Sequence, residues 1–366
     1  MMDGVSILVV CYGRIALLRR LFESILVADK DMPWEVVVVD NSKTNDARAI
    51  ESMCSEFGYR YYYARESVAI KRNLAARYAR YDLLYYCDSD CVLDKRAVMA
   101  HWASYEGDRI GAACGPITLE GENTRFFRTI RGSPWMIAFS LPNEVDTVPW
   151  GPTANFSIRK TVLEEIGGFD ESFPNKPGGE DVDIGVRLNE SGYTIASARQ
   201  AVVYHSNKTW DNPRDVIGRL YNYGRADAKL ITKYPNKTMT MINKVSVHIL
   251  LMLLGAILSL VMADPICILV TFLAMISDFT LSVLIETMVR FHRISGLSEL
   301  TIALLSYVEE IGCVVQCIRW RRVSPIFKQF LYSEYQYRSV FERALCNSAS
   351  FMIVLVMFLS LTFCLL

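Results

Sequence analysis

Hydrophobic and polar positions alternate between two patterns over the first 110 residues. Four apolar or aromatic runs are typical of buried strands, and they cover 5–10, 34–39, 59–63 and 83–87. Apolar residues at helical spacing fill 15–27 and 67–81 between these runs. Strand–helix alternation with short links predicts a parallel, doubly wound α/β sheet. Ligands of such sheets bind beyond the carboxyl ends of the strands, where Asp40 and Asp88 stand.

The pattern becomes irregular between residues 111 and 151, where glycines and prolines interrupt it and Arg125–Arg131 looks exposed. Beyond this part, helical spacing predicts a helix over 181–191. A strand is predicted over 194–204, and it runs directly into His205.

Long apolar stretches follow residue 244. Residues 245–263 carry one histidine and no charge, enough to cross about 30 Å of hydrocarbon at roughly 1.5 Å per residue. Residues 266–289 return as a second span, and 349–366 form a third. The second span contains Asp278 and Glu286, which we expect to snorkel or to bond a neighbouring helix.

A further apolar segment, 297–318, is predicted to lie in the membrane interface instead of crossing it. Glu309 and Glu310 stand in its middle, and the basic cluster Arg319–Arg322 follows at once. We therefore expect three spans. Both ends of the first hairpin should face the cytoplasm because basic residues flank it on both sides, namely Lys233, Lys237, Lys244, Arg290 and Arg293.

Composition agrees with a multi-pass protein of the cell membrane whose N-terminal domain is cytoplasmic. The 39 Lys and Arg balance 39 Asp and Glu, so no basic excess indicates a nucleic-acid partner. The beginning lacks the features of a secretory signal, and the ten cysteines are expected to be buried free thiols. The expected parts are a catalytic domain over 1–212, an interfacial region over 213–244, a transmembrane hairpin over 245–289, interfacial helices over 290–345 and a third transmembrane helix over 346–366.

Two pairs of carboxylates suggest chemistry. Asp88 and Asp90 end a buried strand, and an i,i+2 acidic pair can converge on one divalent cation. Glu180 and Asp181 follow two glycines at the start of a helix. Solvated loop acids and a helix cap are the alternatives for these pairs. His205 is either a structural histidine or a third ligand of the cation.

Six motifs occur in the order found in family 2 glycosyltransferases of the GT-A fold, which the first 230 residues or so resemble. These motifs are Val9–Arg14, Val39–Ser42, Ile70–Asn73, Asp88–Asp90, Ala154–Lys160 and Gly179–Asp181. The resemblance implies a Rossmann-like nucleotide-sugar-binding domain. Cys11 and Gly13 stand where the family often has Thr or Pro and Asn, and Asn41-Ser42 replaces an acidic turn.

By this resemblance, Tyr12 and Asp40 contact the nucleobase and Arg72 holds the nucleotide. Asp88 lies at the ribose and the metal, and Asp90 is the principal ligand of a Mg or Mn ion. The donor would be a nucleotide sugar whose leaving diphosphate needs a divalent ion and cationic side chains.

The same resemblance makes Asp181 the general base that deprotonates the acceptor hydroxyl. Glu180 and Asn155 are expected near the acceptor or the diphosphate. One carboxylate suffices for a direct displacement, so we expect inversion at the anomeric carbon.

The segment before the first span contains Arg219, Tyr223 and Arg225. These side chains either snorkel at the membrane surface or reach the diphosphate or a lipid phosphate. A Gln316–Trp320 sequence matches the acceptor-holding Gln-x-x-Arg-Trp motif of cellulose-synthase-like enzymes. It falls after two spans, out of the family's order, so coincidence or membrane anchoring is the preferred interpretation.

We therefore expect an enzyme that moves one sugar to a lipid-linked acceptor, a polyprenyl phosphate or a lipid-linked oligosaccharide, among membrane lipids. The chain is similar to archaeal membrane mannosyltransferases of lipid-linked glycan assembly, which makes GDP-mannose the expected donor. A UDP-sugar-dependent polysaccharide or glycolipid synthase is the alternative within the same class. A channel or transporter with a nucleotide-sensing domain is the alternative outside it, although a sensor needs no general base.

Overall fold

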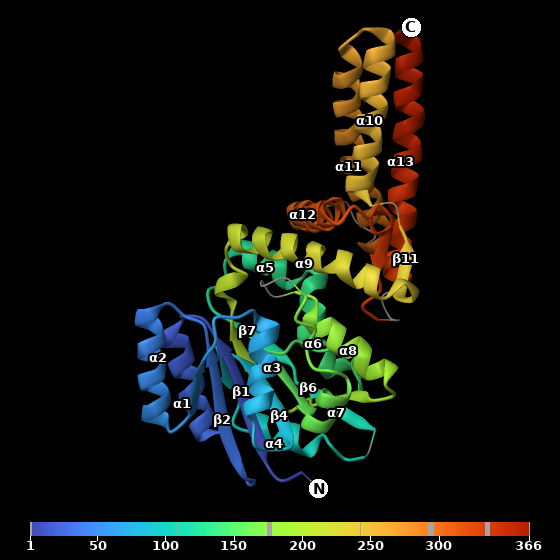
Figure 1. Ribbon diagram of the computed structural model, residues 1–366. Helices are drawn as coiled ribbons and strands as arrows, with labels where there is room; N and C mark the ends of the chain where they lie inside the picture. The colour runs from blue at the N-terminus through green and yellow to red at the C-terminus, as the bar shows by residue number, and fades with distance from the viewer. Residues whose placement is uncertain are drawn as a thin grey trace. The chain divides into compact units, whose positions relative to one another are not determined.

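The computed structural model describes residues 2–107, 109–173, 178–241, 243–291, 296–333 and 337–365 (Figure 1). Two compact units make up the chain, Met1–Asp215 and Val216–Leu366. Arg293, which entered the prediction of orientation, lies outside the described residues.

A seven-stranded sheet forms the centre of the first unit, in the order β3-β2-β1-β4-β8-β6-β9. Its strands are β1 Val5–Cys11, β2 Trp34–Asp40, β3 Arg60–Tyr63, β4 Leu83–Asp88, β6 Ile110–Cys114, β8 Asn155–Arg159 and β9 Thr194–Ser197. The first four run parallel, as predicted. β8, which lies beyond the first 110 residues on which the parallel sheet was predicted, runs antiparallel to both β4 and β6, so the complete sheet is mixed.

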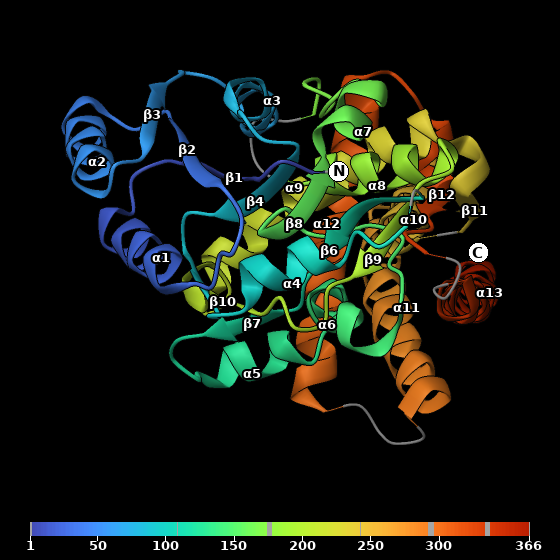
Figure 2. The ribbon, with the colours of Figure 1, turned by 90° about the horizontal axis from the view of Figure 1, so that it is seen from below.

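Helices cover both faces of this sheet (Figure 2). One face carries α1 Ile15–Val27, α2 Thr44–Phe57 and α4 Ala97–Ala103; the other carries α3 Val68–Tyr78, α7 Lys160–Glu165 and α8 Glu180–Glu190. The predicted helices are present because their apolar positions share one side: in α1, Leu18, Leu21, Phe22 and Ile25 are all buried. The α/β GT-A-like domain is thereby confirmed, with long apolar helices following it.

A three-stranded sheet, ordered β5-β10-β7, completes the first unit. It consists of β5 Cys91–Leu93, β7 Ile117–Glu120 and β10 Val203–Ser206. The single strand predicted over 194–204 is therefore two strands, β9 and β10, in different sheets. The irregular part holds α5 Arg125–Arg131, the 3-10 turn η1 Pro134–Met136 and α6 Ile137–Glu144, and a second such turn, η2 Asn207–Thr209, follows β10.

Long helices dominate the second unit. They are α9 Pro213–Lys233, which crosses the unit boundary, α10 Lys244–Met262, α11 Ile266–Phe291, α12 Leu297–Arg319 and α13 Tyr337–Leu365. Short strands β11 Thr238–Thr240 and β12 Lys328–Phe330 pair antiparallel, next to the turns η3 Pro235–Lys237 and η4 Ser324–Phe327.

Four of the described helices are long and apolar enough to cross a membrane by length and composition, one more than the three spans expected. The additional candidate is α12, whose mean hydropathy of 1.5 is below the 2.1 to 2.5 of the others. Figures 1 and 2 show α12 lying across the direction of α13.

The acids inside the apolar helices have partners, so the helix–helix interpretation of Asp278 is confirmed. Ser350 of α13 donates a hydrogen bond to Asp278 of α11 at 2.8 Å, and His248 Nε2 of α10 lies 3.3 Å from the same carboxylate. The other ring nitrogen of His248 is 2.7 Å from the Tyr307 hydroxyl of α12. One polar cluster therefore connects all four apolar helices.

The backbones of α9 and α12 approach each other at two glycines. A Cβ on Gly224 would lie 1.7 Å from the carbonyl oxygen of Glu309, and one on Gly312 would lie 2.1 Å from the carbonyl oxygen of Tyr221. One helical turn further along α12, Arg225 Nε donates to the Gln316 side chain at 2.9 Å. Only glycine permits this contact, because any side chain would strike the opposite backbone.

Candidate active site

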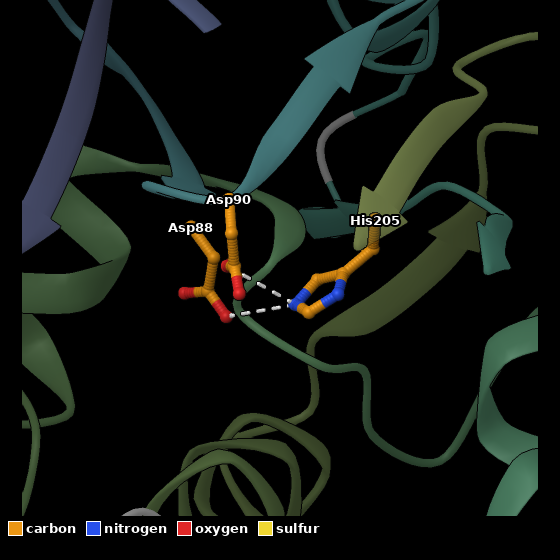
Figure 3. Close-up of side chains that lie close together, drawn as sticks. All are labelled: Asp88, Asp90 and His205. Carbon is orange, nitrogen blue, oxygen red and sulfur yellow. Dashed lines mark ion pairs between the residues drawn. The ribbon is translucent and has the colours of Figure 1, made fainter. Parts of the chain in front are cut away.

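Two sheets bring together the three predicted metal ligands. Asp88 ends β4, Asp90 follows before β5, and β10 pairs with β5 so that His205 lies opposite Cys91. His205 Nε2 is 3.8 Å from Asp88 Oδ2 and 3.3 Å from Asp90 Oδ1 (Figure 3). Ligand atoms of the three residues lie within 4.8 Å of one another. Two carboxylates and an imidazole suit Mg²⁺ or Mn²⁺, so these residues could hold the ion.

The electrostatics of this cluster favour a bound cation. Burial raises the pKa of Asp88, but its hydrogen bond with His205 and the charge of Arg72 outweigh burial and lower that pKa. Burial lowers the pKa of His205, but the raising effect of Cys91, Asp88 and Asp90 is larger, so its pKa is raised to about 10. The acids thus stabilise positive charge at this point, and a metal ion would displace the imidazole proton.

Arg14 is a residue of this site to which the sequence assigned no role. It follows β1 in the left-handed backbone conformation, with φ of 56°, and its guanidinium contacts the Asp90 carboxylate. The Arg14 side chain is 43% exposed, so it stays within reach of solvent and of an anionic ligand. The position of Arg14 at the end of the first motif, Val9–Arg14, was the feature of the sequence that could have indicated a role in the site.

Arg72 connects the two acidic pairs. Its buried guanidinium lies 2.9 Å from Glu180, 3.1 Å from Asp181 and 3.9 Å from Asp88. The side chain comes from α3, the first pair from the end of β4 and the second pair from the start of α8. The groups predicted to hold the metal and to act as base therefore share one cation.

Asp181 has the protonation behaviour of a base that works near neutral pH. Burial raises its pKa, Arg72 counteracts burial, and the adjacent Glu180 raises it again, to about 7. Thr153 donates to this carboxyl twice, from its backbone nitrogen at 3.2 Å and from its hydroxyl at 3.0 Å. These bonds orient the carboxyl, and its side chain remains 22% exposed.

Glu180 supports its neighbours from within the protein. It is buried, and it accepts hydrogen bonds from Arg72 and from the backbone nitrogen of Gly178, both at 2.9 Å. Gly179 adopts a φ of 90° just before α8, in the region that favours glycine. Glu180 therefore fixes Arg72 and the glycine turn.

Asn155, which was expected near the acceptor or the diphosphate, lies inside the core. The residue is fully buried at the beginning of β8. Its amide oxygen lies 2.9 Å from both the Tyr85 hydroxyl and His101 Nε2, and its amide nitrogen donates to two backbone carbonyls. All hydrogen-bonding positions of the amide are thus used inside the core.

The two residues expected at the nucleobase differ in exposure. Tyr12 is 56% exposed beyond the end of β1. Asp40 has no exposed surface and accepts hydrogen bonds from the Ser42 backbone at 2.9 Å and the Tyr61 hydroxyl at 3.1 Å. The contact of Asp40 with a base stays a prediction.

Arg219, Tyr223 and Arg225 belong to the second unit. Arg219 contacts the Tyr223 hydroxyl at 3.5 Å, and Arg225 is held by Gln316 as described above. Their approach to a phosphate stays a prediction.

A cavity of about 330 Å³ lies beside Asp90 in the first unit. Leu17 and Tyr204 contribute apolar surface to it, and Arg20 and Lys208 contribute positive charge. Asp90 belongs to its lining, together with the acids Glu120, Glu122 and Asp211.

Residues 6–167 match the family model described as Glycosyl transferase family 2. This match covers the part of the chain that holds the first motifs, and it agrees with their order. The chain is 35% identical over 96 residues to the Pre-mycofactocin glycosyltransferase of Mycobacterium tuberculosis, covering 26% of this chain and 19% of that protein. It is 26% identical over 227 residues to the Validoxylamine A glucosyltransferase of Streptomyces hygroscopicus, covering 54% of each.

The chain thus spans less than two thirds of the length of these curated relatives. Among solved structures, it resembles the mannosyltransferase PcManGT from Pyrobaculum calidifontis in complex with GDP-Man and Mn2+. The TM-score is 0.47 at 18% identity, covering 63% of this chain and 64% of that one.

Proposed function

We propose that this protein is an inverting, metal-dependent glycosyltransferase that moves one sugar from a nucleotide sugar to a lipid-linked acceptor. The observation that carries the proposal is the link through Arg72 between the metal-binding acids and Asp181. A family 2 glycosyltransferase domain supplies the class of reaction.

The donor would bind at the side of the site that contains Asp88, Asp90 and His205. A divalent ion bound there would neutralise the charge that develops on the leaving diphosphate. Arg14 and Arg72 add two guanidinium groups next to these acids, and a guanidinium is suited to phosphate oxygens. Tyr12 offers an exposed ring to the nucleobase.

Asp181 would take the proton from the acceptor hydroxyl as that hydroxyl attacks the anomeric carbon. A base with a pKa near 7 is ionised often enough to act and basic enough to accept the proton. A single base and direct displacement give inversion, so an α-linked donor yields a β-linked product.

The lipid-linked acceptor follows from the four long apolar helices, which suggest association with a membrane. Arg219 and Tyr223 on α9 would contact a phosphate of the acceptor, and Arg225 would hold α9 against Gln316. The catalytic domain would face the cytoplasm, where nucleotide sugars are made available. A polyprenyl phosphate or a glycan on a polyprenyl diphosphate fits this arrangement.

GDP-mannose is the proposed donor because the architecture, a nucleotide-sugar-binding domain followed by apolar helices, resembles that of archaeal membrane mannosyltransferases. A UDP-sugar is the competing donor, since no residue described at the base-binding end of the site separates guanine from uracil.

The test is to incubate the purified, reconstituted chain with Mn²⁺, a polyprenyl phosphate and each of a panel of radiolabelled nucleotide sugars. The expected result is transfer of label to lipid from GDP-mannose, with a β linkage by NMR. Transfer from a UDP-sugar and not from GDP-mannose would show that the donor is a UDP-sugar. An α linkage in the product would refute inversion. No release of sugar from any donor would refute the enzymatic proposal.

A further inference from the structure

The segment from Thr124 to Asn143 of the first unit is strongly basic. It contains three arginines, no lysine and no acidic residue. α5, η1 and α6 except its last residue, the exposed acid Glu144, occupy this segment, and Figure 2 shows α5 at the periphery of the unit next to β7. The proposed catalytic reaction uses none of its side chains.

The three arginines form one exposed face of α5, here called the arginine face: Arg125, Arg128 and Arg131. The spacing i, i+3, i+6 keeps them on the same side of a helix. Phe127 and Ile130 lie on the opposite side and are buried, so α5 cannot rotate its charges inward. Thr124 fixes the start of the helix by accepting a hydrogen bond from the Phe127 backbone at 3.0 Å.

No acidic side chain among the described residues pairs with the positive charge of this face. Over the part of the chain that the structure describes, none of the three arginines forms an ion pair, and Arg128 donates only to the backbone carbonyl of Asn123 at 2.8 Å. Ile137, further along the same segment, is 48% exposed, and Trp135 is partly exposed. Arginine beside exposed apolar and indole side chains is the composition of a surface that lies at membrane headgroups.

We propose that the arginine face binds the anionic phospholipid headgroups of the membrane and so docks the catalytic unit on the bilayer surface. Charge complementarity argues for this partner, because three uncompensated cations face solvent in a chain whose other unit carries four long apolar helices. The inference concerns the surface of the first unit alone and does not depend on the reaction proposed above.

Each arginine near an anionic leaflet should favour the docked state about fivefold, so the three together should favour it about 100-fold. The attraction must weaken when salt is added, because the Debye length falls from about 10 Å at 0.1 M to about 3 Å at 1 M.

The experiment uses the full chain in nanodiscs, with a bimane fluorophore attached through Gly132→Cys. Gly132 is exposed at the end of α5, its φ is −86°, and an added Cβ would meet nothing closer than 3.7 Å. The nine native cysteines that the structure describes are buried, and the unsubstituted chain, labelled in parallel, gives the background. Lipids that carry a nitroxide on the headgroup quench the fluorophore only when α5 lies at the surface.

The expected result is strong quenching in nanodiscs rich in phosphatidylglycerol and weak quenching in phosphatidylcholine alone. The triple variant Arg125→Gln, Arg128→Gln and Arg131→Gln should lose the quenching, and 1 M salt should reduce it, as the Debye length of about 3 Å requires. The matched control carries Arg48→Gln, Arg77→Gln and Arg109→Gln, three exposed arginines elsewhere on the same unit, and should be quenched like the unmodified face.

Any of four results would overturn the proposal. Equal quenching in both lipids would show that charge does not drive the contact. If the control variant lost as much quenching as the triple variant, the net charge of the unit, and not the arginine face, would cause the binding. Quenching that appears only after a polyprenyl phosphate is added to phosphatidylcholine would assign the arginines to the acceptor. Absence of quenching in every nanodisc would refute docking on lipid and would indicate that the arginine face binds a soluble partner.

Discussion

The raised pKa of Asp181 makes a quantitative prediction about the pH dependence of transfer. If Asp181 is the base, the rate follows the fraction of its carboxyl that is ionised. With a pKa of about 7, that fraction is about 9% at pH 6 and about 91% at pH 8. Single-turnover transfer should therefore be about tenfold faster at pH 8 than at pH 6, because protonation removes the base as pH falls.

Two substitutions test the cause of this profile. Asp181→Asn removes the base and should lower the rate by about 10²- to 10⁴-fold, leaving the pH dependence flat. Glu180→Gln removes the negative neighbour that raises the pKa of Asp181, so the midpoint of the profile should move to lower pH. Glu190→Gln is the matched control, because Glu190 lies at the exposed end of the same helix, and its profile should equal that of the wild type.

The assay is transfer to lipid measured under single-turnover conditions in mixed buffers, with donor affinity measured separately by calorimetry. Asp181→Asn should retain donor affinity, since the base faces the acceptor hydroxyl. A wild-type midpoint below pH 5 would refute the assignment of the base. So would a donor affinity that falls in Asp181→Asn as far as the rate does.

Two further predictions concern the metal-binding cluster and the helix contact. His205→Ala should weaken Mn²⁺ binding at least about tenfold by calorimetry, because it removes one of three ligands; unchanged affinity would exclude His205 from the cluster. Gly224→Ala should lower the melting temperature of the detergent-solubilised chain by the equivalent of about 1–3 kcal/mol, since its Cβ would collide with the Glu309 carbonyl. Gly218→Ala on the same helix meets open space and should stabilise by about 0.4–1 kcal/mol; equal effects of the two substitutions would disprove the close contact.

Much of the first unit was predictable because local patterns determine it. Buried strands read as continuous apolar runs, and the acids that follow β4 necessarily stand at its carboxyl end. The predicted convergence of Asp88, Asp90 and His205 is confirmed as a possible metal site. Strand direction was not predictable for β8, because a buried run has the same composition whichever way it points. α2 was missed because its polar residues dominate and only Ala47, Ile50, Met53 and Cys54 face the core.

The partners of charged side chains were the least predictable feature. Arg14 and Asp90 are 76 positions apart, and Arg72 and Glu180 are 108 apart, so no local pattern pairs them. Asn155 shows the converse error: a residue inside a functional motif can serve the core that supports the motif. Glu309 and Glu310 argued against a span in α12, yet the helix is long and apolar enough by composition to be one. The composition of an apolar helix does not determine whether the helix crosses the membrane or lies along its surface.

The shared guanidinium of Arg72 has a consequence for protein engineering at this site. Asp88, Glu180 and Asp181 draw on the same positive charge, so a change to any one of them alters the surroundings of the other two. Double-mutant cycles among them should be strongly non-additive. Protein engineering should therefore replace Arg72 and its three acids together or leave all four unchanged.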